Sequence, residues 1–89
     1  MANTPIDTLR DGSLKATIWK NHGEKGNFFT VTITRTYKDD AGNYHDSDSF
    51  SGTQLLQMRH LAGRAYDRVN ELRAADRAAL ENQSAVANA

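Results

Sequence analysis

The sequence predicts an α+β fold in which three antiparallel strands, joined by a possible short fourth strand from the N-terminal arm, precede one long C-terminal helix. Three segments, 14–21, 28–38 and 44–50, carry the composition of strands and are separated by turn-forming residues. From residue 55 onward the apolar residues recur at helical spacing instead. The 89 residues contain no cysteine, which excludes disulfides, zinc fingers and thiol catalysis and leaves packing to stabilise a single small domain.

The two ends of the chain lack a clear pattern. Residues 1–12 show no periodicity and finish in the turn pair Asp11-Gly12, so we expect a flexible N-terminal arm. Residues 82–89 are polar and unpatterned, and we expect a disordered tail. The folded domain is predicted to span residues 13–81.

The first two predicted strands alternate in character. In 14–21 the apolar positions Leu14, Ala16 and Ile18 share one face, and Lys15, Thr17 and Trp19 share the other. Residues 21–27 contain two glycines and predict a hairpin loop of moderate length. The next strand, 28–38, is rich in β-branched and aromatic residues, with apolar side chains at odd positions and threonines at even ones.

Residues 39–43 predict a second hairpin, in which Gly42 takes a positive φ and closes a type I turn with a bulge. Two registers for the strand Tyr44 to Phe50 remain open, because a shift of one residue reverses its faces. The preferred register places Arg35 opposite Asp48. A shift of one residue at the Gly42 bulge would place Phe50 opposite Thr32.

A long helix is predicted to follow. Ser51 and Gln54 have the spacing of a capping box, and no strong stop signal occurs before about Leu80. A helix of 25 or more residues would reach roughly 38 Å, which is longer than three adjacent strands can cover. We therefore expect a homodimer formed through the helix, with the interface at Met58, Ala62, Ala65, Val69 and Leu72.

The charge of the chain is balanced in total but unevenly placed. Residues 13–38 carry five Lys or Arg against one Glu, which gives +4, whereas residues 39–48 carry four Asp and no cation. The sequence contains neither an apolar run long enough to span a membrane nor a signal peptide, so we expect a cytoplasmic protein. His22, His45 and His60 lack metal-ligand spacing, and we expect no enzyme activity, no metal and no cofactor.

Aromatic and basic residues interleave along the first two predicted strands. Exposed rings can stack on unpaired bases while nearby cations contact phosphates, so this composition is typical of a surface that holds single-stranded nucleic acid. Phe28 belongs to the same pattern. The predicted contact residues are Lys15, Trp19, Lys20, Lys25, Arg35, Tyr37 and Lys38.

Residues 31–43, then 47–50, then Gln54-Leu55-Leu56, resemble the core of the transcriptional coactivators of the positive-cofactor-four type, a branch of the Whirly-like single-strand binders. The resemblance covers about residues 14 to 72. It implies a curved antiparallel sheet, a long C-terminal helix, dimerisation through the helices and single-stranded DNA bound across the strands. It also implies DNA contacts for Lys15, Trp19, Arg35, Tyr37 and Lys38. The acidic third strand, 45–49, departs from the basic, glycine-rich strand of that family.

Two functions follow as hypotheses. The first is a nonenzymatic protein that binds single-stranded nucleic acid, DNA in preference to RNA, in transcription, replication or repair. The second is a small dimeric protein-interaction module of phage or mobile-element type, whose acidic hairpin docks a partner. A continuous positive surface would favour the first, and an exposed face dominated by Asp39, Asp40, Asp46 and Asp48 would favour the second.

Overall fold

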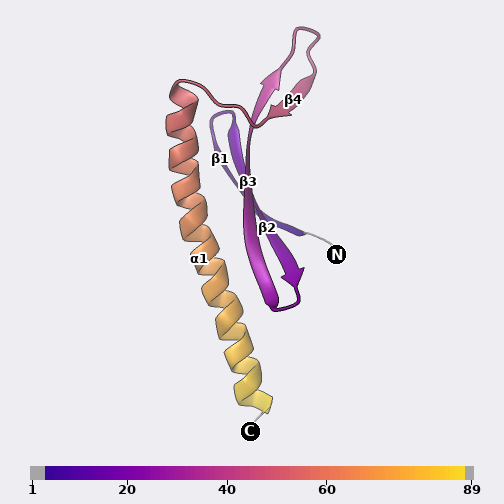
Figure 1. Cartoon of the computed structure of the whole chain (residues 1–89), viewed down its shortest axis with the longest axis vertical. Coiled ribbons are helices and arrows are strands. Elements are labelled where there is room, and N and C mark those ends of the chain that lie inside the picture. Colours follow the sequence, from indigo (N-terminus) through magenta and orange to yellow (C-terminus); the bar gives the residue numbers. More distant parts are fainter. Residues whose placement is uncertain (1–3, 88–89) are drawn as a thin grey trace.

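The computed structural model, which describes residues 4–87, confirms the α+β class (Figure 1). Four antiparallel strands lie side by side in chain order: β1 (Thr4–Asp11), β2 (Leu14–Gly23), β3 (Gly26–Lys38) and β4 (Tyr44–Ser47). The helix α1 (Thr53–Ala87) follows them and lies along one face of the sheet. Figure 1 also shows the hairpin of β3 and β4 extending beyond the rest of the sheet.

Strand β1 replaces the flexible arm that was expected for residues 1–12. It pairs with β2 from Thr4 opposite Lys20 to Asp11 opposite Leu14, so the possible fourth strand is present and the arm prediction is wrong for residues 4–11. An irregularity between Pro5 and Asp7 shifts the register. Such a shift interrupts the alternation of side chains, which hides the strand in the sequence. Residues 1–3 lie outside the described part of the chain.

The turn between β2 and β3 is tighter than the loop predicted for residues 21–27. Gly23 pairs with Gly26, which leaves a connection of two residues. Gly26 has φ +120°, a value that suits glycine and allows the strands to continue almost to the turn.

The ladder between β3 and β4 follows the shifted register. Arg35 pairs with Ser47, so the preferred opposition of Arg35 and Asp48 is wrong. The one-residue shift is confirmed, although β4 ends at Ser47 and the ladder does not reach the predicted pair of Phe50 and Thr32. Arg35 donates instead to the backbone carbonyl of Ser49 at 3.1 Å.

The turn itself determines this register. The Asp39 N–H donates to the carbonyl of Asn43 at 2.9 Å, and the Gly42 N–H donates to the carbonyl of Asp39 at 3.0 Å. The Asp39 carboxylate accepts the N–H groups of Ala41 and Asn43. Gly42 has φ +90°, so the predicted type I turn with a glycine bulge is confirmed and adds one residue to the β4 side.

The helix begins and continues as the sequence indicates, but it ends later. The side chain of Gln54 accepts the N–H of Ser51 at 3.1 Å, as in the predicted capping box. The helix has 35 residues and therefore a length of about 52 Å. Residues 82–87 are helical, so the prediction of a disordered tail is wrong there, and residues 88–89 lie outside the described part.

The core lies between α1 and the first half of the sheet. Its fully buried apolar residues are few, and Leu9, Ile33, Phe50 and Met58 pack around its main cluster. Two residues predicted for a helix interface, Met58 and Ala65, therefore pack on the chain's own sheet, because the small side chain of Ala65 lets the helix approach the strands closely. The buried apolar residues are Leu14, Ala16, Ile18, Leu61 and Ala65.

Candidate nucleic-acid interface

One face of the sheet is left uncovered because α1 packs on the other. Side chains alternate between the faces of a strand, and Leu14, Ala16 and Ile18 are buried on the helix side. Lys15 and Trp19 consequently share the opposite side, as the sequence indicates. The register places further residues there, and we define this open face by Thr8, Arg10, Lys15, Thr17, Trp19, Asn21, Phe28, Thr30, Thr32, Thr34, Thr36, Lys38, Tyr44 and Asp46.

Trp19 is held along the open face. Its register partner on β3 is Thr30, and its indole N–H donates to the hydroxyl of Thr32 at 3.0 Å. This bond restrains the half-buried ring, so the indole is positioned before any ligand arrives. Phe28 is 52% exposed and lies on the same face, two residues before Thr30 along β3. Two aromatic rings are thus available for stacking.

The other end of the open face is basic. Arg10 pairs with Lys15 across β1 and β2, so both cations lie on the same side. The Lys15 ammonium forms an ion pair with Asp46 of β4 at 3.2 Å, and the Thr36 hydroxyl donates to the same carboxylate at 2.9 Å. The hydrogen bond from Thr36, followed by that from Lys15, lowers the pKa of Asp46 below its ordinary value.

The seven predicted contact residues do not form one surface. Lys15, Trp19 and Lys38 lie on the open face, and Lys25 lies in the turn between β2 and β3. Lys20 lies on the helix side, where its ammonium binds Asp76 of α1 at 3.1 Å. Arg35 and Tyr37 share that side by strand parity. The prediction was based on the composition of the strands. It did not take into account that successive side chains point to opposite faces, so it combined residues from both faces.

Arg35 and Tyr37 form a second cluster on the β3–β4 hairpin. The guanidinium of Arg35 lies 5.3 Å from the centre of the Tyr37 ring. Tyr37 stacks on His45 with ring centres 5.4 Å apart, and His45 Nε2 lies 2.7 Å from the Asp39 carboxylate. That contact is the largest single cause that lowers the pKa of Asp39, and the turn N–H groups lower it further. These rings and charges are largely engaged with one another.

Sequence reasoning missed Arg10, which contributes a cation to the open face. The residue lies in the segment for which the sequence predicts a flexible arm. The strand could have been recognised from its alternating side chains: Leu9 points toward the core, and Thr8 and Arg10 point away from it. This alternation extends over only a few residues after the irregularity in β1.

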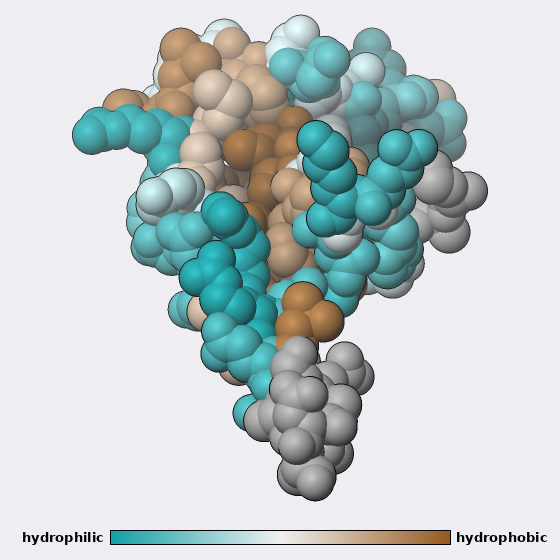
Figure 2. All heavy atoms as spheres, turned by 60° about the horizontal axis from the view of Figure 1, so that its bottom comes forward, coloured by the Kyte–Doolittle hydropathy of each residue, from teal (hydrophilic) through white to brown (hydrophobic). Residues whose placement is uncertain are grey.

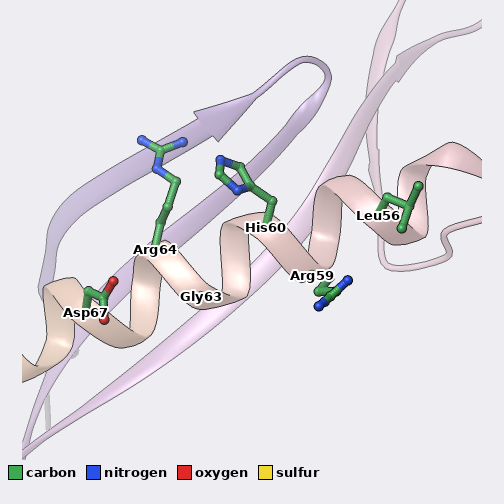
Figure 3. A pocket seen from close by; sticks show the side chains of 6 residues that line it. All are labelled: Leu56, Arg59, His60, Gly63, Arg64 and Asp67. Atoms are coloured by element: carbon green, nitrogen blue, oxygen red, sulfur yellow. The ribbon is translucent and has the colours of Figure 1, made fainter.

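The hollow on the outer side of α1 does not have the form of a binding site (Figure 3). It encloses about 550 Å³ around Gly63. Figure 3 shows His60 and Arg64 pointing toward the hairpin of β1 and β2, whereas Arg59 points to the other side of the helix. The Arg64 guanidinium donates to the Arg10 carbonyl at 3.0 Å. The cationic groups therefore diverge instead of converging on one ligand.

Comparison of the chain with protein-family models, curated proteins and solved structures finds no match. Among residues 4–87, no helix combines the length and the apolar content needed to cross a membrane. The same residues contain no group of three or more His, Cys, Asp or Glu side chains that could hold a metal ion. Function is therefore inferred from the geometry of the open face.

Proposed function

We propose that this protein is a nonenzymatic binder of single-stranded nucleic acid, DNA in preference to RNA, that acts in transcription, replication or repair. The observation that carries the proposal is the open face, where Trp19 and Phe28 occupy one end of an uncovered sheet and Arg10 and Lys15 the other. Rings at this position can stack on bases, while the cations contact the phosphates of the same strand.

The threonines between these two ends support the same proposal. Thr30 and Thr32 are exposed and Thr34 and Thr36 are half-buried along β3, so hydroxyl groups line the path from the rings to the cations. Hydroxyls can donate to phosphate oxygens without selecting a base sequence. The resemblance to coactivators of the positive-cofactor-four type, which implies an antiparallel sheet followed by a long helix, points in the same direction.

The acidic hairpin offers less charge to a protein partner than its sequence suggests. Asp39 is engaged by the turn N–H groups and His45, and Asp46 is paired with Lys15. Asp40, Asp46 and Asp48 are exposed, but the charge of Asp46 is already offset by Lys15. The partner-docking hypothesis, which needs a dominant negative surface, is therefore the weaker of the two.

A titration with labelled oligo-dT at two salt concentrations tests the proposal. The chain contains one tryptophan, so stacking on Trp19 should quench the intrinsic fluorescence of the protein as the oligonucleotide binds. Affinity should fall as salt rises, and duplex DNA of equal length should bind more weakly because its bases are already stacked. Absence of binding at low salt, or equal affinity for duplex and single strand, would contradict the proposal.

Variants of the two faces locate the contact. Trp19→Ala should weaken single-strand binding by about 1 to 3 kcal/mol through the lost stack. Lys15→Gln should reduce the salt slope by about 0.7, the value for one phosphate contact. Lys20→Gln removes the same charge from the helix side, where Lys20 is paired with Asp76, and it serves as the matched control. Equal effects of the two lysine variants would indicate that the open face is not the contact surface.

A further inference from the structure

The outer edge of β3 is open over most of its length. The strand runs from Gly26 to Lys38, but β4 pairs only with its last four residues, Arg35 to Lys38. Among the described residues, no strand pairs with the outer edge between residues 27 and 34. An unpaired edge of this length exposes a row of backbone donors and acceptors that another strand can use.

The backbone groups on this edge can be assigned. The Thr36 N–H donates to the carbonyl of Ser13 at 2.9 Å, toward β2. Because successive N–H groups of a strand point to opposite sides, the even residues of β3 bond to β2 and the odd residues point outward. The N–H and carbonyl groups of Phe29, Val31 and Ile33 therefore form the open edge.

This edge carries none of the usual features that prevent strand pairing. Residues 27–34 contain neither a charged residue nor a proline, and their register with β2 shows no irregularity. Natural edge strands are ordinarily protected by charges, prolines, bulges or a covering element. A covering element from another chain would meet this requirement.

An apolar groove lies next to the edge. It is lined by Phe29, Val31 and Ile33 of β3 and by Ala62, Tyr66 and Val69 of α1, and it encloses about 320 Å³. The Tyr66 side chain is 69% exposed. In Figure 2, hydrophobic side chains gather in a hollow between hydrophilic ones. The groove and the edge share β3, so one occupant can cover both.

The single chain also exposes more surface than a compact monomer of its mass. Its accessible surface is 6555 Å², whereas the scaling rule for monomers gives about 5,200 Å². Its radius of gyration is 17.0 Å, against about 12 Å for a compact domain of this length. The difference in area, roughly 1,350 Å², exceeds the roughly 800 Å² that each partner buries in a standard interface.

We propose that a second copy of this chain covers this surface by pairing its own β3 edge antiparallel with the first, which joins two four-stranded sheets into one. Any antiparallel register that uses the outward-pointing groups places odd residues opposite odd residues. Phe29, Val31 and Ile33 of one copy then meet the same apolar set of the other, and threonines meet threonines. The surface is thus complementary to itself, as an interface about a two-fold axis requires.

This arrangement differs from the expected contact between helices alone. Of the five predicted interface residues, Ala62 and Val69 line the groove, and so does one side of the buried Ala65. The strand edge adds directional hydrogen bonds to this apolar contact. Pairing at the edge also leaves the open face uncovered and extends it across both copies, so that a longer strand of nucleic acid could follow it.

Val31→Pro tests the pairing directly. The Val31 N–H points outward, so proline removes a donor of the edge and leaves the hydrogen bonds to β2 in place. Sedimentation equilibrium of the unaltered chain should give twice the 9.9 kDa chain mass, and Val31→Pro should shift the protein to a monomer with unchanged helix content. Val31→Ala keeps the N–H and is the matched control, which should remain largely dimeric.

Amide hydrogen exchange of the unaltered chain provides a measurement that does not depend on a variant. The outward amides of Phe29, Val31 and Ile33 should become more protected as protein concentration rises, whereas the inward amide of Thr32 should change far less. A monomer at tens of micromolar would overturn the proposal. A dimer whose outward amides stay unprotected, and which Tyr66→Glu but not Val31→Pro dissociates, would show a contact through the groove alone and would overturn the edge pairing.

Discussion

Asp46 illustrates how one carboxylate can set the strength of a basic surface. It binds both Lys15 and Thr36 and lies close enough to Arg10 for that cation to help lower the pKa of its carboxyl group. A phosphate of a bound strand would require the same donors. The carboxylate therefore competes with the ligand of the proposed interface.

We expect Asp46→Asn to strengthen binding of oligo-dT, because the carboxylate no longer competes with the phosphate that Lys15 contacts. Asp40→Asn removes the same charge at the exposed hairpin turn and provides the control. The two variants should be compared by fluorescence titration at matched salt concentrations. Equal gains in both would show a general charge effect without competition at Lys15.

Asp39 links the β3–β4 hairpin to pH. Its carboxylate bonds to His45 and to the turn N–H groups of Ala41 and Asn43, and these contacts lower its pKa from 3.8. A carboxyl whose pKa is lower in the folded state stabilises the fold above its unfolded pKa. That contribution is lost as the pH falls through the folded value.

The hairpin should therefore loosen in acid, below about pH 4. The amide resonances of Gly42 and Asn43, followed by NMR as the pH is lowered, should move toward unfolded values in that range. In Asp39→Asn they should be less dependent on pH. A turn that is unchanged at the lowest pH at which the core remains folded would contradict this role of the carboxylate.

At the level of single side chains, the sequence predicts the composition of the site better than its arrangement. The alternation of residues 14–19 correctly placed Lys15 and Trp19 on one face, because strand geometry has a period of two. Lys20 and Arg35 were assigned to the same surface by their charge, although their parity places them with Leu14 on the helix side. Arg10 was not predicted as a contact residue, because the strand on which it lies, β1, was not predicted with its full length.

Among the elements, the β3–β4 hairpin shows a turn overriding the pairing preferences of the strands. Cross-strand preferences favoured Arg35 opposite Asp48, with a contribution of about 0.2 to 1 kcal/mol for such pairs. The turn makes several hydrogen bonds through Asp39 and uses the positive φ of Gly42. The sum of these local bonds exceeds one exposed charge pair, so the register follows the turn.

Two glycine substitutions should change stability in opposite directions. Gly42→Ala should lower the free energy of unfolding by about 1 kcal/mol or more, because φ +90° disfavours any residue with a Cβ atom.

Gly63→Ala should raise the free energy of unfolding by about 0.5 to 1 kcal/mol, because a Cβ there meets nothing within 4 Å and alanine favours the helix. Urea unfolding of both variants measures the difference. A destabilised Gly63→Ala would indicate a close neighbour at that position.

The elements most fully predicted were those with strong local signals. The start of α1 follows from the Ser51–Gln54 capping box, and β2 and β3 follow from their alternation. The full length of strand β1 was not predicted, because its irregular register interrupts the alternation of side chains. The end of α1 was not predicted either, because polar residues can remain helical where no glycine or proline ends the helix.

For the whole molecule, the thin core implies that stability depends on contacts at the surface of the sheet. Ion pairs join the helix to strands β1 and β2: Arg68 binds Asp7 at 2.8 Å, and Asp76 binds Lys20 at 3.1 Å. Half-buried pairs at the surface, such as these, contribute little individually. The larger contribution is expected from the second copy, which would bury the groove and the edge of β3.

The melting temperature should therefore rise with protein concentration, as it does when folding and association are coupled. Thermal unfolding followed by circular dichroism at two concentrations, tenfold apart, measures the effect. Val31→Pro should melt at a temperature independent of concentration. A constant melting temperature for the unaltered chain would argue against coupled association.

Strand β3 serves two surfaces at once, since its even residues belong to the open face and its odd residues to the groove. One inserted or deleted residue within 28–36 would exchange the two surfaces over the rest of the strand. Natural variation in chain length should consequently be confined to the turns at 24–25 and 40–43. Within 29–34 of β3, odd positions should keep hydrophobic side chains and even positions should keep hydroxyl side chains. An alignment of related chains should show this period of two residues.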